Sequence, residues 1–134
     1  FEATTVSVGR GTDRPFEMFG HPKFPKDEFQ FTPVSTIGAK SPLYENKNCN
    51  GIDLYSSISK RKYEINLNYL IQAKELLGDS VMFVDQMGFF NRLAGTSKLR
   101  EQIYAGWTAK EIRATWQPGL QEFRKIRQKY LLYE

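Results

Sequence analysis

Residues 9–16 read GRGTDRPF, and this stretch decides how we expect the first half of the chain to fold. Its two glycines allow the backbone to turn sharply. Thr12 or Asp13 can cap a short helix, and Pro15 lies close to the first helical position, where a missing N–H costs nothing. The stretch therefore predicts a tight loop that runs into a short helix, which ends at Gly20.

The same loop is a candidate anion site. Gly9 and Gly11 would let the backbone approach a ligand closely, and a helix N-terminus offers unpaired N–H groups. Arg10 and Arg14 could each bind a carboxylate through a forked pair of hydrogen bonds. The pattern is neither the phosphate-binding P-loop nor the dinucleotide Gly-x-Gly-x-x-Gly fingerprint. The loop therefore suits a carboxylate or a phosphate in some other setting.

The alternative for this loop is a structural turn, in which the arginines pair with Asp13, Glu17 or Glu2. Glu2 is itself a candidate: a carboxylate among Thr4, Thr5 and a nearby arginine could bind sugar hydroxyls or act as an acid or base. A glutamate on a strand can equally be only solvated. A glycosidase normally needs two carboxyl groups flanking the bond, and the sequence offers no second one with a defensible position.

Other reactive side chains are few. The single cysteine, Cys49, and the single histidine, His21, exclude an internal disulfide and a zinc site made of Cys and His ligands. His21 could line a cleft or only hydrogen-bond locally. Cys49 is expected to be a packed or surface thiol, because the sequence shows no Cys–His pairing. A serine-hydrolase elbow is absent, and neither a metal nor an organic cofactor is indicated.

The two halves of the chain differ in composition and in expected secondary structure. Five of the six prolines lie in residues 1–60, which read as short strands and loops, whereas residues 61–134 read mainly as helices. Strands are expected over 1–8, 29–31 and 51–55, and helices over 66–78, 89–93 and 97–104. From the short helix after the first loop, Phe16 and Phe19 are expected to face the core. We predict an α+β fold, with a small sheet from the N-terminal half packed by helices from the C-terminal half.

The last part of the chain predicts a long helix. Thr108-x-x-Glu111 is a capping box. Apolar residues then recur every three or four positions, at Ile112, Trp116, Leu120, Phe123, Ile126 and Tyr130. This spacing predicts one buried stripe, and Pro118-Gly119 predicts a kink or break in the helix.

Length and charge bound the class of protein. The 134 residues give room for one domain, and 40% hydrophobic with 25% charged residues favours a globular fold. Apolar stretches are too short to span a bilayer. The net charge of +4 comes entirely from residues 61–134, which carry 12 basic and 8 acidic side chains. A nucleic-acid reader would concentrate more charge on one face, so we expect a solvated helical surface and no nucleic-acid partner.

Taken together, several segments carry a family resemblance. Residues 2–12, with Pro15-Phe16 and Gly20-His-Pro22, resemble the signature that opens the C-terminal domain of NamZ-type exo-β-N-acetylmuramidases, formerly a bacterial family of unknown function. Weaker matches follow in order at Phe31-Thr-Pro33, Asn48-Cys-Asn-Gly51, Phe90 with Leu93-Ala-Gly95, and Phe123, Arg127 and Tyr130-Leu-Leu-Tyr133. The resemblance spans essentially the whole chain. It departs from the family pattern at Ala3 and Thr5, where Gly and Asn are common.

The resemblance implies a role in bacterial cell-wall turnover. Members remove terminal N-acetylmuramic acid from the non-reducing ends of peptidoglycan fragments, in the cell envelope (periplasm) or after secretion. A larger Rossmann-like N-terminal domain carries most of the catalytic carboxylates, and the cleft lies between the two domains. Residues 1–134 would then be the C-terminal domain of a longer protein, which fits a chain that begins with Phe1 rather than Met. Alone, this domain is expected to be inactive.

Arg10 is the residue to which both the anion-binding chemistry of the first loop and the family resemblance point. N-acetylmuramic acid differs from N-acetylglucosamine by a lactyl ether that carries a carboxylate. We expect Arg10 to bind this carboxylate, with Thr12 and the N–H groups of the loop around Gly11 helping, Arg14 as the substitute and Glu2 nearby. The rivals are a non-catalytic peptidoglycan- or carbohydrate-binding module, a nucleic-acid-binding domain that uses the basic C-terminal helix, and a domain whose aromatics only pack on a partner.

Overall fold

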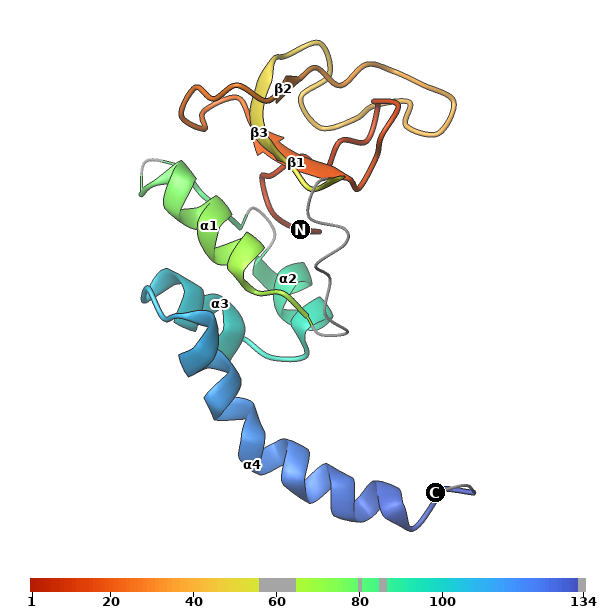
Figure 1. The fold of residues 1–134 in the computed structure, drawn as a ribbon, viewed down its shortest axis with the longest axis vertical. Helices are drawn as coiled ribbons and strands as arrows, with labels where there is room; N and C mark the ends of the chain where they lie inside the picture. The colour runs from red at the N-terminus through yellow and green to blue at the C-terminus, as the bar shows by residue number, and fades with distance from the viewer. Residues whose placement is uncertain (56–64, 80, 85–86, 133–134) are drawn as a thin grey trace.

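The computed structural model describes residues 1–55, 65–79, 81–84 and 87–132. The elements follow in the order β1 (Met18–His21), β2 (Gln30–Phe31), β3 (Cys49–Asp53), α1 (Asn68–Leu77), α2 (Met87–Ala94), α3 (Lys98–Tyr104) and α4 (Ala109–Gln128). The sheet lies at one end, α1 to α3 pack beside it, and α4 extends away from them as an arm (Figure 1). The predicted α+β class is confirmed.

The sheet has three antiparallel strands in the order β1-β3-β2. The predicted strands near 29–31 and 51–55 are confirmed as β2 and β3, with small shifts of their ends. The strand predicted over 1–8 is wrong: within the described residues this segment makes two isolated bridges, one from Thr4 to Val84 and one from Ser7 to Gly20 through two hydrogen bonds of 2.9 Å. The bridge from Ser7 ties the N-terminal segment to the free side of β1.

The short helix predicted after the first loop is also wrong. Residues 9–17 form turns, and the chain then enters strand β1. Phe19 is fully buried as predicted, but Phe16 is exposed and has a positive φ of 68°. The local capping signals do not decide the structure here, because pairing of β1 with β3 forms more backbone hydrogen bonds than a single helical turn would.

The pairing of β1 with β3 depends on two glycines that face each other. Gly20 lies opposite Gly51, and the ring of Phe31 from β2 covers both. A Cβ on Gly20 would lie 2.4 Å from the Asn50 carbonyl oxygen and 2.8 Å from Phe31 Cε1. The two backbones therefore approach at a distance that only glycine permits.

One main core joins the sheet to the helices. Phe19 from β1 and Val6 from the N-terminal segment pack with Leu67, Phe83 and Ile112 from the C-terminal half. Phe1 stacks on Phe19, with ring centroids 4.9 Å apart. A smaller cluster of Met18, Phe31 and Cys49 fills the other face of the sheet. The sheet is therefore packed by the helices as the sequence predicts.

The predicted helices of the second half are confirmed, with boundaries within a few residues. Gly78, Gly95 and Gly106 follow α1, α2 and α3 with positive φ values, as expected for residues that end a helix. The capping box is present in α4, where Thr108 and Glu111 exchange hydrogen bonds. This helix runs through Pro118 without a break and changes direction along its length (Figure 1).

The prediction of one buried stripe along α4 is wrong for most of its length. Ile112 is fully buried and Trp116 is partly buried against the core. Beyond them Leu120, Phe123 and Ile126 are exposed, as is Tyr130 after the helix, because α4 leaves the body as an arm. Tyr133, the end of the resembling C-terminal segment, lies outside the described residues.

The glycine pair gives a stability prediction. Gly20→Ala should lower the free energy of unfolding by about 1–3 kcal/mol, because the new Cβ overlaps the β3 backbone and Phe31. Gly119→Ala is the control: nothing lies within 4 Å of a Cβ there, and alanine in a helix should stabilise by roughly 0.5–1 kcal/mol. Urea denaturation measures both. Equal stabilities of wild type and Gly20→Ala would contradict the close approach.

Candidate functional site

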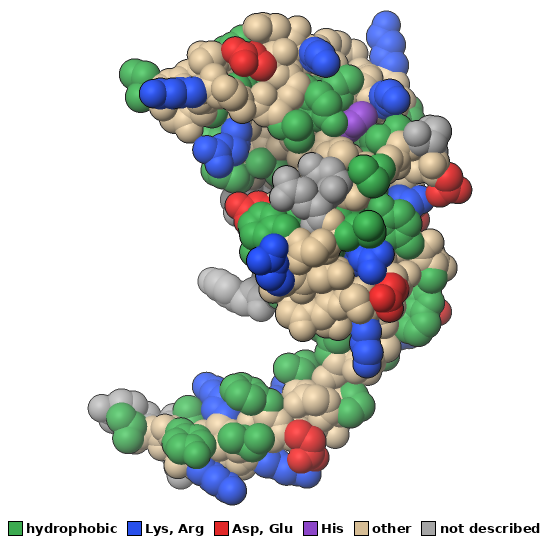
Figure 2. All heavy atoms as spheres, turned by 180° about the vertical axis from the view of Figure 1, so that it is seen from behind, with side chains coloured by type: hydrophobic (Ala, Val, Ile, Leu, Met, Phe, Trp, Pro, Cys, Tyr) green, Lys and Arg blue, Asp and Glu red, His purple; other side chains and the backbone are tan. Residues whose placement is uncertain are grey.

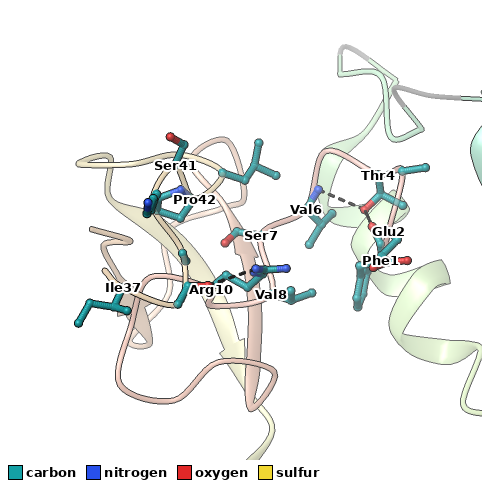
Figure 3. A pocket seen from close by; sticks show the side chains of 15 residues that line it. Phe1, Glu2, Thr4, Val6, Ser7, Val8, Arg10, Ile37, Ser41 and Pro42 are labelled. Atoms are coloured by element: carbon teal, nitrogen blue, oxygen red, sulfur yellow. Dashed lines mark hydrogen bonds between the residues drawn. The ribbon is translucent and has the colours of Figure 1, made fainter. Parts of the chain in front are cut away.

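A cleft of about 600 Å³ lies between the N-terminal segment and the loop that precedes β3 (Figure 3). One side comes from residues 1–10 and the other from residues 37–43. Its charged lining residues are Glu2, Arg10 and Lys40, while Phe1, Val8 and Ile37 supply apolar surface. This combination of hydroxyl, apolar and charged groups is suited to a small ligand that is both polar and anionic.

Arg10 is an exposed cation in the lining of this cleft. Its Nη2 donates to the Gly38 carbonyl oxygen at 3.3 Å. Figure 3 shows its side chain beside Ser7 and Val8, while Glu2 lies beside Phe1. Among the described residues Arg10 has no ion pair, with Glu2 or with another carboxylate. Its guanidinium therefore keeps donors for an incoming carboxylate.

The hairpin opposite Arg10 was not predicted from the sequence. Thr36 and Ala39 exchange two backbone hydrogen bonds of 3.0 and 3.1 Å, so Ile37-Gly38 is a two-residue hairpin tip. Ile37 is fully exposed at this tip, and Lys40 follows it along the cleft. The available signal was Gly38, with Ser35 and Thr36 before it and Ser41-Pro42 after it, a composition that is typical of a tight turn.

Gly11 and Thr12 do not line the cleft; they hold the arginine loop in place. Gly11 has a φ of 86°, and a Cβ there would lie 2.6 Å from the Val34 carbonyl oxygen and 2.7 Å from Pro42. The Val34 N–H donates to the Gly11 carbonyl oxygen at 2.9 Å. The arginine loop is therefore clamped against the loop that carries the hairpin.

Four N–H groups of residues 9–16, those of Gly9, Thr12, Arg14 and Phe16, donate within the domain, whereas those of Arg10, Gly11 and Asp13 have no acceptor among the described residues. The Thr12 hydroxyl donates to the Gly9 carbonyl oxygen at 2.7 Å and accepts from the Arg14 N–H at 3.2 Å. The Thr12 N–H also donates to Gly9, and the Phe16 N–H donates to Val8. Since no helix begins here, the expected contribution of a helix N-terminus to anion binding is absent. The role of Gly11 and Thr12 in binding substrate stays a prediction.

Arg14 lies away from the cleft and forms an ion pair with Asp53 of β3 at 3.1 Å. Its guanidinium also lies about 6 Å from the rings of Phe29 and Tyr55. The pKa of Asp53 is lowered, first by the Tyr55 N–H that it accepts and then by Arg14. The predicted alternative of an arginine paired in a structural turn thus fits Arg14, but its partner is neither Asp13, Glu17 nor Glu2.

His21 faces a second, smaller hollow of about 380 Å³, which Thr5, Tyr44 and Met82 also line. Its Nδ1 accepts from the Lys23 N–H at 2.8 Å, and its ring meets the Tyr44 ring edge-on at 4.8 Å. Burial lowers the pKa of His21, and Lys23 lowers it further. His21 therefore is neutral at pH 7 and both lines a hollow and bonds locally.

Cys49 is a packed thiol, as predicted. It is the first residue of β3 and is fully buried against Met18 and Phe31, and burial raises its pKa to about 11. A thiol with so high a pKa holds little thiolate at neutral pH and is a poor nucleophile. Among the described residues no three His, Cys, Asp or Glu side chains lie together as a metal site.

The two departures from the family signature have local explanations. Ala3 has a φ of 60°, the left-handed region that favours glycine, so glycine at this position would remove strain. The Thr5 hydroxyl donates to the Met82 carbonyl oxygen at 2.9 Å and faces the His21 hollow rather than the cleft beside Arg10. Thr5 therefore joins the N-terminal segment to the region before α2.

Fold and cleft together define a small α+β domain with a polar, cation-bearing pocket at its edge, the kind of surface that binds a small anionic ligand. The family model described as "Exo-beta-N-acetylmuramidase NamZ, C-terminal" matches residues 1–133, and the chain belongs to this family.

Two known proteins share the whole domain. The chain is 32% identical to the peptidoglycan beta-N-acetylmuramidase NamZ of Bacillus subtilis (strain 168), over 98% of this chain and 35% of that protein. The crystal structure of a DUF1343 family protein from Bacteroides fragilis NCTC 9343 superposes with a TM-score of 0.85 at 41% identity, over 100% of this chain and 38% of that one. The chain thus spans little more than a third of the length of the relatives it matches.

The buried histidine predicts a pH-dependent stability. The pKa of His21 in the folded chain lies below the 6.5 of the unfolded chain, so the unfolded state binds more protons as the pH falls below about 6.5. The free energy of unfolding should therefore fall between about pH 7.5 and 5.5. His21→Asn, which keeps an acceptor for the Lys23 N–H, should lose less stability over the same range in urea denaturation. An equal loss in both proteins would argue against this role.

Proposed function

We propose that residues 1–134 are the C-terminal domain of a longer bacterial protein that removes N-acetylmuramic acid from the non-reducing ends of peptidoglycan fragments. The family match and the named Bacillus relative support this activity. A preceding domain, Rossmann-like as in the family, would form the other side of the cleft. Because the substrate is cell-wall material, the protein would act in the cell envelope or outside the cell.

The observation that carries the proposal is the position of Arg10. Its guanidinium lies exposed in the cleft without a carboxylate partner among the residues that the structure describes, and Lys40 adds a second positive charge to the lining. In the proposed complex Arg10 binds the lactyl carboxylate of N-acetylmuramic acid. A charge-assisted hydrogen bond of this kind contributes about 1.5–3 kcal/mol, which is roughly 10-fold to over 100-fold in affinity.

The other residues predicted to bind substrate have different roles in the proposed complex. Gly11 and Thr12 would act by holding Arg10 in position, since both lie in the clamped loop rather than in the cleft. Arg14 remains the substitute for Arg10, although its pairing with Asp53 reduces the donors it could offer. Arg10 is therefore the residue to test first.

Glu2 is the carboxylate that this domain would contribute to the reaction. Within the part of the chain that the structure describes, it is the only Asp or Glu in the lining of the cleft, and it has no ion pair with Arg10. Glycoside hydrolysis normally needs two carboxyl groups flanking the bond. The second would come from the preceding domain, so the isolated domain would bind substrate weakly and not turn it over.

The specificity prediction compares two substrates. In the full-length protein, Arg10→Ala should lower kcat/KM for a chromogenic N-acetylmuramic acid glycoside by roughly 10-fold to over 100-fold. Activity on the N-acetylglucosamine analogue, which lacks the carboxylate, should change little. Steady-state kinetics with both substrates measures the loss of discrimination.

Arg14→Ala is the matched control for Arg10→Ala, because it removes the same side chain from a site outside the cleft. It should cost stability, through the lost pairing with Asp53, and leave substrate preference intact. A loss of preference in Arg14→Ala with none in Arg10→Ala would make Arg14, the substitute candidate, the ligand of the carboxylate. An unchanged preference in a folded Arg10→Ala protein would contradict the assignment. Binding of muramic glycosides by a folded full-length protein without any turnover would favour the non-catalytic binding module.

A second kinetic prediction concerns Glu2. If its carboxylate takes part in proton transfer, Glu2→Gln should reduce kcat by about 100-fold or more while KM changes little. A rise in KM at unchanged kcat would make Glu2 a substrate ligand instead. Wild-type kinetics in Glu2→Gln would place it outside the site.

A further inference from the structure

The apolar face of α4 is covered only in its first two turns. Ile112 is fully buried and Trp116 is partly buried, whereas Leu120, Phe123, Ile126 and Tyr130 are 42–78% exposed. We call these last four residues the distal stripe. Figure 2 shows hydrophobic side chains gathered along the arm that this part of the chain forms.

The distal stripe continues the face that packs into the core. Its residues recur every three or four positions from Ile112 onwards, so a helix of 3.6 residues per turn places Leu120, Phe123 and Ile126 on the same side as Ile112. Tyr130 follows two positions after the helix ends. The opposite side of the same turns carries Gln121, Lys125 and Gln128. A face that begins as protein core and stays apolar for three further turns is built for packing against protein.

The distal half of α4 also lacks local support. Pro118 has no N–H to donate to the preceding turn, which weakens the link to the anchored half. Within the distal half, the Lys125–Glu122 pair is mostly exposed, and such pairs contribute little. A helical segment of about three turns is marginal in water unless its apolar face is packed.

The part of the relatives that lies beyond the matched region indicates what covers the distal stripe. The Bacillus and Bacteroides relatives have roughly two-thirds of their length beyond the region matched, and the family model is that of a C-terminal region. Most of that length therefore precedes the residue equivalent to Phe1. Phe1 lies between the sheet and the helices, whereas α4 extends away from them as an arm (Figure 1). A preceding domain is therefore the partner that the longer chain itself supplies for the arm.

We propose that the distal stripe docks onto the domain that precedes Phe1 in the full-length protein and fixes how that domain sits against this one. The proposal rests on the presence of the preceding domain in the proposed function, and is independent of the activity. The basic residues on the rest of the distal half, such as Arg124 and Lys125, remain in solvent.

Hydrogen exchange of the full-length protein tests the docking directly. In the wild type, amides of residues 120–128 should exchange slowly, because docking holds this half of α4 in place. Phe123→Glu with Ile126→Glu should speed this exchange by roughly tenfold or more, since two apolar contacts are replaced by buried charges. Gln121→Glu with Gln128→Glu adds the same charge to the opposite side and should leave exchange unchanged.

Other occupants of the stripe give different results. Fast exchange in the wild type would overturn the proposal. Protection that is lost on dilution would make the stripe an interface with a second copy, and protection found only with phosphatidylglycerol vesicles would make it a lipid-binding face; either would also overturn it. Should the double variant fail to fold, Phe123→Ala with the same readout decides. Protected amides in a protein that hydrolyses no muramic glycoside would support docking while contradicting the proposed function.

Discussion

The close approach of β1 and β3 at Gly20 and Gly51 is the contact on which the sheet and the N-terminal side of the cleft depend. With no side chain at either position, the two backbones meet under the ring of Phe31. The other side of Gly20 is then free to bridge Ser7, which aligns the N-terminal segment beside the sheet. That segment forms one side of the cleft, so the contact between the two glycines helps to place Glu2 and Arg10.

The two arginines of the first loop show how tertiary structure divides equivalent residues between roles. Both lie in one short loop, and both could bind a carboxylate by their chemistry. Arg14 meets Asp53, which β3 carries to it from 39 positions further along the chain. Arg10 is left facing the cleft, with a backbone carbonyl as its hydrogen-bond partner. The first stabilises the loop, and the second keeps its charge available to a ligand.

Patterns that depend on near neighbours were predictable. The helices α1, α2 and α3 with their terminal glycines, the capping box at Thr108, the packed thiol of Cys49 and the family itself all follow from local signals. Strand β1 was not predictable, because its partner β3 lies some thirty positions away and the local signals around Thr12 favour a helix instead. The hairpin at Ile37-Gly38 carries only a weak turn signal, and its position opposite Arg10 depends on the clamp at Gly11.

The sequence by itself determined the fold class, the periodic apolar face of α4 and the residue types that can bind an anion, because these depend on spacing along one chain. Only the tertiary structure decided which arginine stays unpaired and where the apolar face of α4 leaves the core. Those outcomes depend on contacts between distant segments: Asp53 with Arg14, and the body of the domain with Ile112 but not with Phe123. Periodicity fixes which side of a helix is apolar, and only packing decides what covers it.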